Sequence, residues 1–61
     1  MKKILIIEDD INISALEQDY LEANSFEVKT AADGITGLSL ALNEDFNLIL
    51  LDIMLPGMDG L

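Results

Sequence analysis

Two short runs of continuously apolar residues do most to constrain the fold of this chain. They are "KILII" at residues 3–7 and "NLILL" at residues 47–51. A strand buried on one face only alternates apolar and polar residues, whereas an uninterrupted apolar run of this length is typical of a strand covered on both faces. We therefore expect both runs to be strands of a sheet that has helices on its two sides.

The stretch between these runs predicts a helix that begins near residue 12. Apolar residues recur there at helical steps of three and four, at Ile13, Leu16, Tyr20 and Ala23. Asn24 follows, and asparagine is one of the few residues that adopt the left-handed conformation of a helix stop. We therefore predict a helix over residues 12–23 whose apolar stripe packs on the sheet.

A second strand and a second helix follow. The segment "FEVKTA" at residues 26–31 alternates in polarity, so we expect a strand with one wetter face at an edge of the sheet. Asp33 is a suitable N-cap for a helix over residues 34–42. The apolar stripe of that helix consists of Ile35, Leu38, Ala41 and Leu42. Gly34 and Gly37 lower its helix propensity.

The order of these elements predicts an α/β fold. Strands that alternate with helices form parallel sheets with right-handed crossovers. Because residues 26–31 have the character of an edge strand, residues 3–7 lie in the middle, and the strand order is 2-1-3 with one helix on each face. Residues 47–51 then form the other edge although they are apolar on both faces, an arrangement that soluble proteins avoid. We therefore expect a further surface to cover that strand.

Acidic residues follow both apolar strands at the same edge of the predicted sheet. Glu8, Asp9 and Asp10 come directly after the first run, and Asp52 comes directly after the last. In an open parallel sheet, ligands bind beyond the carboxyl ends of the strands where the winding reverses, and the order 2-1-3 puts that reversal between these two strands. Neighbouring strands lie about 4.8 Å apart, so three carboxylates can converge within roughly 5 Å of one another. Each like-charge pair then costs on the order of 3 kcal/mol at an effective dielectric near 20.

This acidic edge suits a hard divalent cation. An oxygen-only pocket of negative charge fits Mg²⁺, which accepts one or two carboxylates, a carbonyl and several waters. We expect Glu8, Asp9 and Asp52 to form the pocket. For Asp10 and Asp33 the alternative role of helix N-cap is equally open.

Composition excludes several classes of function. The chain contains no histidine and no cysteine, which excludes a histidine-based triad, a phosphohistidine, disulfides and thiolate metal sites. Its formal net charge is −9 with three lysines as the only cations, so we expect no contact with nucleic acid. The apolar run at the N-terminus is too short for an export signal or a membrane span. We therefore expect a cytoplasmic protein that makes no contact with membranes.

Two sequence motifs in combination resemble a known family. "ILIIEDD" near the N-terminus and "LLDIMLPGMDG" near the other end resemble the first half of the receiver domain of bacterial two-component response regulators, and the similarity covers essentially the whole chain. The resemblance implies a flavodoxin-like, doubly wound sheet, of which residues 1–61 would be a truncated receiver domain. The glutamate at the first acid position and "DIMLPGMDG" are most similar to the transcription regulators that carry a winged-helix DNA-binding domain.

The resemblance also implies a role for each acid. Asp52 would accept a phosphoryl group from a sensor histidine kinase, with Mg²⁺ as the cofactor. Asp9 would bind the metal directly and Glu8 through water, with Asp52 and the backbone carbonyl of Met54 as further ligands. As a phospho-acceptor of this kind, the chain would not be an enzyme.

Three hypotheses of function follow. The first is a phospho-acceptor receiver; complete receivers continue through two more strands and three helices, which supply a Ser or Thr and a Lys, so we expect these 61 residues not to signal alone. The second is a half-domain that self-associates as a homodimer through its third strand and performs no signalling. The third, a metal-dependent phosphatase with Asp52 as nucleophile, is disfavoured because Met54 stands where that chemistry usually has another acid.

Overall fold

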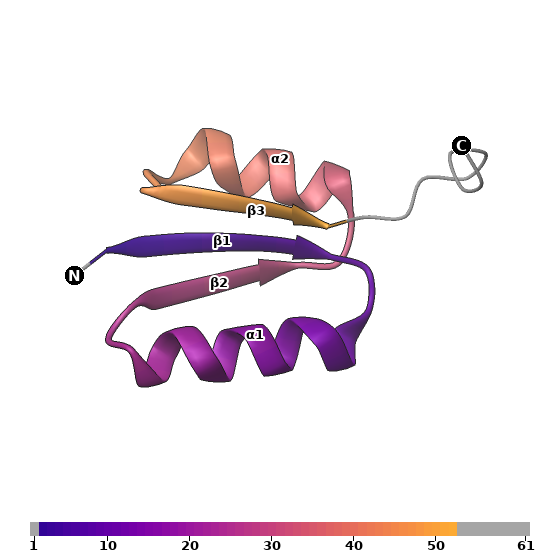
Figure 1. Ribbon diagram of the computed structural model, residues 1–61. Helices are drawn as coiled ribbons and strands as arrows, with labels where there is room; N and C mark the ends of the chain where they lie inside the picture. The colour runs from indigo at the N-terminus through magenta and orange to yellow at the C-terminus, as the bar shows by residue number, and fades with distance from the viewer. Residues whose placement is uncertain (1, 53–61) are drawn as a thin grey trace, which may run out of the picture.

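The computed structural model describes residues 2–52, which form three strands and two helices (Figure 1). In chain order they are β1 (Lys3–Glu8), α1 (Ile11–Ala23), β2 (Glu27–Ala31), α2 (Gly34–Asn43) and β3 (Leu48–Asp52). All strands are parallel, and their order is β2-β1-β3. This confirms the predicted α/β fold and strand order, which correspond to half of a flavodoxin-like sheet.

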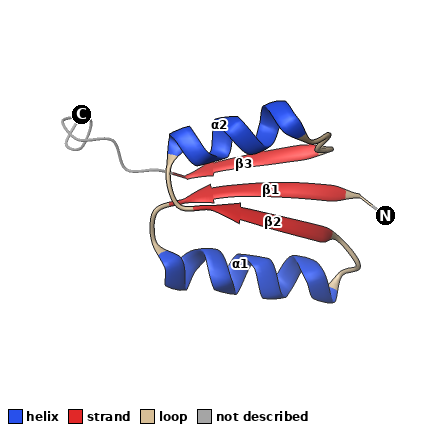
Figure 2. Ribbon diagram, turned by 180° about the vertical axis from the view of Figure 1, so that it is seen from behind, coloured by secondary structure: helices blue, strands red, loops and turns tan. Residues whose placement is uncertain are grey.

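One helix packs on each face of the sheet, as Figure 2 shows from behind. Successive side chains of a strand point to opposite faces. Those of β1 therefore divide between two apolar clusters. The cluster on the α1 side consists of Ile4, Ile6 and Val28 with Leu21, Phe26 and Leu50 packed against them. The cluster on the α2 side consists of Leu5, Ile7 and Ala31 with Leu40, Ala41 and Phe46. The first apolar run is thus a strand covered on both faces, as predicted.

The third strand lies at an edge of the sheet and is poorly covered. Within residues 2–52, β3 pairs only with β1, and both helices pack over β1 and β2. The side chains of Leu48, Ile49 and Leu51 are 50%, 44% and 70% exposed. The expected conflict between an apolar sequence and an edge position is therefore present in the structure.

The predicted packing faces of the helices are partly wrong. Leu16 and Tyr20 of α1 are each 70% exposed, and α1 meets the sheet through its Ser14 and Leu21 side instead. In α2, Ile35, Leu38 and Leu42 are exposed, while Ala41 packs on the sheet as predicted. The reason is that each helix has a broader apolar surface than β1 and β2 can cover. Helical periodicity identifies that surface without showing which part of it meets a neighbour.

Both helices begin at aspartate caps. The Asp10 carboxylate accepts hydrogen bonds from the backbone N–H groups of Asn12 and Ile13 at 2.9 and 3.2 Å. The Asp33 carboxylate accepts one from the Thr36 N–H at 2.7 Å, and this bond lowers the pKa of Asp33 below its ordinary value. The N-cap alternative is thus confirmed for both residues.

The turn after α1 corrects the predicted helix stop. Asn24 is the C-cap but has a φ of −99°, and its side-chain amide donates to the Tyr20 carbonyl at 2.8 Å. The left-handed residue is Ser25, with a φ of 70°. Asparagine serves here through its side chain, which closes the last turn, so the unusual backbone conformation falls on the next residue.

A glycine lets α2 approach β1 closely. A Cβ atom built on Gly37 would lie 2.4 Å from Cδ1 and 2.6 Å from Cγ1 of Ile7. Both distances are shorter than real Cβ atoms allow. Gly37 thus weakens the helix, as expected from its propensity, but makes the contact between α2 and β1 possible.

The amino end of β1 carries Lys2 and Lys3, and polar contacts join it to the segment before β3. Lys3 donates through Nζ to the Glu44 carboxylate, which raises the pKa of Lys3 and lowers that of Glu44. The Asn47 N–H donates to the Lys3 carbonyl at 2.8 Å, and the Asn47 side chain accepts from the Lys3 N–H at 2.8 Å.

Neither described helix is long and apolar enough to cross a membrane.

Candidate functional site

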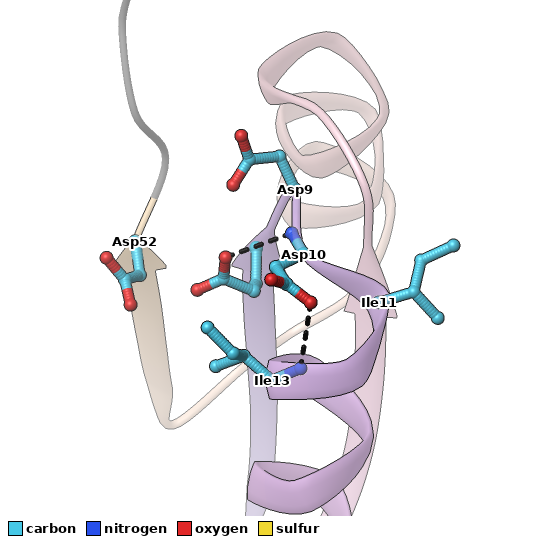
Figure 3. A pocket seen from close by; sticks show the side chains of 6 residues that line it. Asp9, Asp10, Ile11, Ile13 and Asp52 are labelled. Carbon is cyan, nitrogen blue, oxygen red and sulfur yellow. Dashed lines mark hydrogen bonds between the residues drawn. The ribbon is translucent and has the colours of Figure 1, made fainter.

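The carboxyl ends of β1 and β3 bring acids from distant parts of the sequence together. Glu8 and Asp52 are direct neighbours in the parallel register of these strands. Asp9 and Asp10 follow β1 in the loop that leads into α1. The acids surround an open hollow of about 640 Å³, which Figure 3 shows from close by. The predicted position of the site, at the reversal of winding between β1 and β3, is therefore the position of a hollow in the structure.

Glu8 is the buried acid of this cluster. Its side chain is only 4% exposed, and its Oε1 atom accepts a hydrogen bond from the Asp10 backbone N–H at 3.0 Å. The other oxygen, Oε2, is buried and has no hydrogen-bond partner in the described part of the chain. The Asp10 N–H by itself lowers the pKa of Glu8, but burial and the neighbouring Asp52 and Asp9 carboxylates outweigh it and raise that pKa above the ordinary value. A buried, unsatisfied carboxylate oxygen is costly unless a cation or donor approaches it.

The other acids around the hollow differ in role. Asp52, the last residue of β3, is exposed to solvent and so can be reached by another molecule. Asp9 is exposed in the loop after β1, and both carboxylates lie around the same hollow in Figure 3. Asp10 is turned toward the first turn of α1, where its carboxylate caps the helix. Of the four acids, Asp10 therefore already has a structural role, because its carboxylate accepts the hydrogen bonds of the helix cap.

The predicted convergence of three carboxylates is not found in this structure. Among residues 2–52, no group of three acidic side chains lies close enough together to hold a metal ion. Consecutive residues such as Glu8 and Asp9 point in different directions, which separates their carboxylates. Met54, whose backbone carbonyl the sequence predicts as a ligand, lies outside the described residues. The assignment of Glu8, Asp9 and Asp52 to a metal stays a prediction.

The donor set nevertheless fits a hard cation. All the side chains that could serve as ligands at this edge are carboxylates, which suits Mg²⁺ rather than a softer metal. The unsatisfied Oε2 atom of Glu8 is the structural observation in favour of such an ion, because a cation or its bound water would satisfy that oxygen.

Apolar residues near the site were missed by sequence reasoning. Ile11 and Ile13 line the acidic hollow and are 74% and 43% exposed, so they form an apolar rim beside the acids. A second hollow, of about 320 Å³, lies between α1 and β3. It is lined by Leu16, Glu17, Tyr20, Leu21 and Leu50. The spacing of four between Leu16 and Tyr20 is a signal for this surface, although helical periodicity alone predicts a buried stripe there.

A family model and individual known proteins match this chain and agree with one another. The family model of the response regulator receiver domain matches residues 4–61. A CpxR homolog of Haemophilus influenzae, named as a transcriptional regulatory protein, is 41% identical over 61 residues, which are 100% of this chain and 26% of the relative. The response regulator ArlR of Staphylococcus saprophyticus is 44% identical over 100% of this chain and 28% of its own length. RpaA of Synechocystis, a DNA-binding transcriptional regulator, is 48% identical over 98% of this chain and 25% of its own length.

The chain spans about a quarter of the length of these curated relatives. No solved structure matches it.

Proposed function

The chain belongs to the family of response regulator receiver domains, and on that premise we propose that it is a phospho-acceptor module of two-component signal transduction. Asp52 is the acceptor and a sensor histidine kinase is the donor. The observation that supports this role is the position of Asp52, exposed at the end of β3 and directly beside the buried Glu8.

The reaction at Asp52 is a transfer from nitrogen to oxygen. A carboxylate oxygen of Asp52 attacks the phosphorus of the kinase's phosphohistidine, the new O–P bond forms, and the P–N bond breaks. The electron pair of that bond stays on the imidazole nitrogen. The chain acts as the acceptor of the group and not as an enzyme.

Glu8, Asp9 and Asp52, with the Met54 carbonyl, would hold a Mg²⁺ ion in this proposal. The ion supplies positive charge that offsets the negative charge of the phosphoryl oxygens. Glu8 contributes a fixed charge on the central strand, because its Oε1 atom is held by the Asp10 N–H while Oε2 is left unpaired in the described part of the chain. Asp52 contributes the nucleophile from the neighbouring strand.

A metal titration tests the site without any phosphoryl transfer. Mn²⁺ and Mg²⁺ should bind weakly, and Mn²⁺ should broaden the amide signals of Asp9 and Asp52 in NMR spectra. Asp52→Asn or Asp9→Asn should abolish this, whereas Asp19→Asn, which removes the same charge from exposed α1 surface, should not. Equal binding by the Asp9→Asn/Asp52→Asn double variant would refute the assignment.

Phosphorylation of the 61-residue chain by a small donor should be slow. The resemblance expects a Ser or Thr and a Lys from the part of a receiver that follows the third strand, and residues 53–61 contain none of these residue types. The absence of one charge-stabilising group commonly costs on the order of 10²-fold or more in rate. Mass spectrometry after treatment with acetyl phosphate or phosphoramidate measures the modification. Any phosphoryl group should be absent from Asp52→Asn. Modification of that variant to the same extent would show that Asp52 is not the acceptor, and fast stoichiometric modification of the unchanged chain would show that no further group is needed.

We also propose that the chain is part of a transcription regulator with a winged-helix output domain. The support is the set of relatives named as transcriptional regulators, together with Glu8 and the "DIMLPGMDG" segment.

A second candidate function, self-association as a homodimer, is favoured by the edge position of β3. Leu48, Ile49 and Leu51 are 44% to 70% exposed on the two faces of a strand that pairs on one side only within residues 2–52. Light scattering at several concentrations should give the molar mass of two chains. A well-folded single chain at micromolar concentration would contradict this candidate.

A further inference from the structure

Asp10 forms hydrogen bonds in two directions, to α1 through its side chain and to β1 through its backbone. Its carboxylate accepts from the N–H groups of Asn12 and Ile13 at 2.9 and 3.2 Å and so caps α1. Its own backbone N–H donates to Oε1 of Glu8 at 3.0 Å. Figure 3 marks bonds of both kinds with dashed lines. One residue thus joins the first turn of α1 to the buried acid at the end of β1.

The helix fixes the direction of this backbone N–H. The Asp10 carbonyl accepts from the Ser14 N–H at 3.0 Å, and the Asp10 carboxylate accepts the two capping bonds. Residue 10 is therefore tied to α1 through both its side chain and its carbonyl. These bonds hold it at a φ of −92° and a ψ of 110°, the extended conformation of an N-cap. Without the capping bonds, residue 10 regains the freedom to turn and its N–H can leave Glu8.

The sequence of the first turn leaves this N–H available. In a capping box, a Glu or Gln at the third residue of the helix accepts a bond from the N–H of the cap residue. The third residue of α1 is Ile13, whose side chain has no acceptor. The Asp10 N–H therefore bonds to Glu8, two residues before it, without competition from the helix.

The Glu8 carboxylate depends on this bond for its orientation. Glu8 is 4% exposed, and within residues 2–52 the Asp10 N–H is the donor to its Oε1 atom while Oε2 has no partner. Its neighbour in the register is Asp52, which carries the same charge. A glutamate side chain has three rotatable bonds, so a carboxylate without a donor adopts several orientations. A ligand that is already oriented binds a cation more tightly, because binding then has less freedom to remove.

We infer that Asp10 is a positioning residue for the cation that Glu8, Asp9 and Asp52 would hold. Its carboxylate caps α1, and the cap keeps the Asp10 N–H on Oε1 of Glu8, which leaves Oε2 as the free oxygen of a residue that lines the hollow. The inference rests on the proposed phospho-acceptor site and adds to it a residue that does not touch the ion. Loss of a hydrogen-bond partner of a metal ligand typically weakens metal binding about 10- to 100-fold.

Two variants of the full chain separate the cap from the charge of Asp10. Asp10→Asn and Asp10→Ala remove the same charge, but asparagine caps a helix as well as aspartate does, whereas alanine has no acceptor. Amide hydrogen exchange in the absence of metal reports on the bond to Glu8. The protection factor of the residue-10 amide should be at least about fivefold lower in Asp10→Ala than in Asp10→Asn. The Leu5 amide, in the middle of β1, serves as the reference for unfolding of the whole chain.

A Mn²⁺ titration of the same variants reports on the ion. Asp10→Asn should weaken binding slightly because a charge beside the hollow is lost, and Asp10→Ala should weaken it about tenfold further. Asp33→Ala is the matched control, since it removes the cap of α2 and Asp33 does not line the hollow. It should lower the stability of the chain without changing the Mn²⁺ affinity. If Asp10→Ala fails to fold, Asp10→Gly replaces it, because glycine also lacks the acceptor but costs a helix start far less than alanine.

The outcomes distinguish this role from stability and from the metal site itself. Equal protection of the residue-10 amide in Asp10→Asn and Asp10→Ala would overturn the inference, because the cap would then not hold the N–H on Glu8. An equal loss of Mn²⁺ affinity in Asp33→Ala and Asp10→Ala would also overturn it, because affinity would then follow stability alone. If the unchanged chain binds no Mn²⁺, the metal site is refuted and the role toward the ion falls with it. A difference in protection would in that case still show that the cap orients Glu8.

Discussion

Replacing Gly37 by alanine should destabilise the chain although it improves the helix. Two opposing terms act. Alanine is favoured over glycine in a helix interior by about 1 kcal/mol. Against this, the new methyl group would lie 2.4 and 2.6 Å from two carbon atoms of Ile7, where carbon atoms normally lie about 3.5 to 4 Å apart. Ile7 is 7% exposed and belongs to the cluster on the α2 side, so it has little room to move.

The size of the effect follows from the difference between these terms. Extra methyl groups in a packed core typically cost about 1 to 3 kcal/mol. After the helix gain is subtracted, we expect Gly37→Ala to lower the free energy of unfolding by about 1 kcal/mol. Gly34→Ala makes the same chemical change at the exposed first residue of α2 and should change it by less than about 0.5 kcal/mol.

A double-mutant cycle identifies the contact responsible. Ile7→Val removes Cδ1, the atom closest to the new methyl group, and alone should cost about 1 kcal/mol. In the Gly37→Ala background it should cost close to nothing, so the two changes should couple by about 1 kcal/mol. Urea unfolding followed by circular dichroism, at one fixed protein concentration, measures all four chains. If Gly37→Ala stabilises the chain by the full helix-propensity gain, or the changes are additive, α2 does not approach β1 as described.

Three further changes test other features. Ser25→Gly should raise the free energy of unfolding by roughly 0.5 to 1 kcal/mol in urea, because Ser25 has a φ of 70°, whereas Asn24→Gly should lower it. The Thr36 N–H keeps the pKa of Asp33 below its ordinary value, so Asp33 stabilises the fold above about pH 4 and this contribution is lost as the pH falls through its folded-state pKa. The urea midpoint of Asp33→Asn should therefore approach that of the unchanged chain in acid, and a gap independent of pH would contradict the cap. Leu50→Lys should unfold the chain as it dissociates it, with loss of the helical circular dichroism signal, and a folded monomer would show that β3 needs no cover.

The sequence predicts the arrangement of the sheet well because that arrangement depends on side-chain alternation. Residues 3–7 are apolar without interruption, and this run alone indicates a strand with a helix on each face. The meeting of Glu8 and Asp52 follows from strand order, since the carboxyl ends of neighbouring parallel strands lie at one edge.

Features that depend on the fit between elements are not visible in the sequence. The glycine at 37 is the same residue whether it weakens a helix or permits a close approach, and only the 2.4 Å distance to Ile7 decides between these roles. Likewise, the stripe with Leu16 and Tyr20 is helical in spacing, but its exposure depends on how far the sheet extends beneath α1. Whether the Oε2 atom of Glu8 has a hydrogen-bond partner depends on the orientation of that one side chain, which the sequence does not specify.

The uneven distribution of charge along β1 gives the molecule a permanent electric dipole. Glu8, Asp9, Asp10 and Asp52 lie at the carboxyl end, whereas at the amino end the lysines offset Glu27, Glu44 and Asp45. The two ends belong to a strand of six residues and so lie roughly 20 Å apart. In the field of an approaching cationic surface, the molecule rotates until the end that carries Asp52 leads. A larger fraction of collisions then begins with the acidic edge foremost. This orientation speeds association, and the gain falls as added salt shortens the distance over which the field acts.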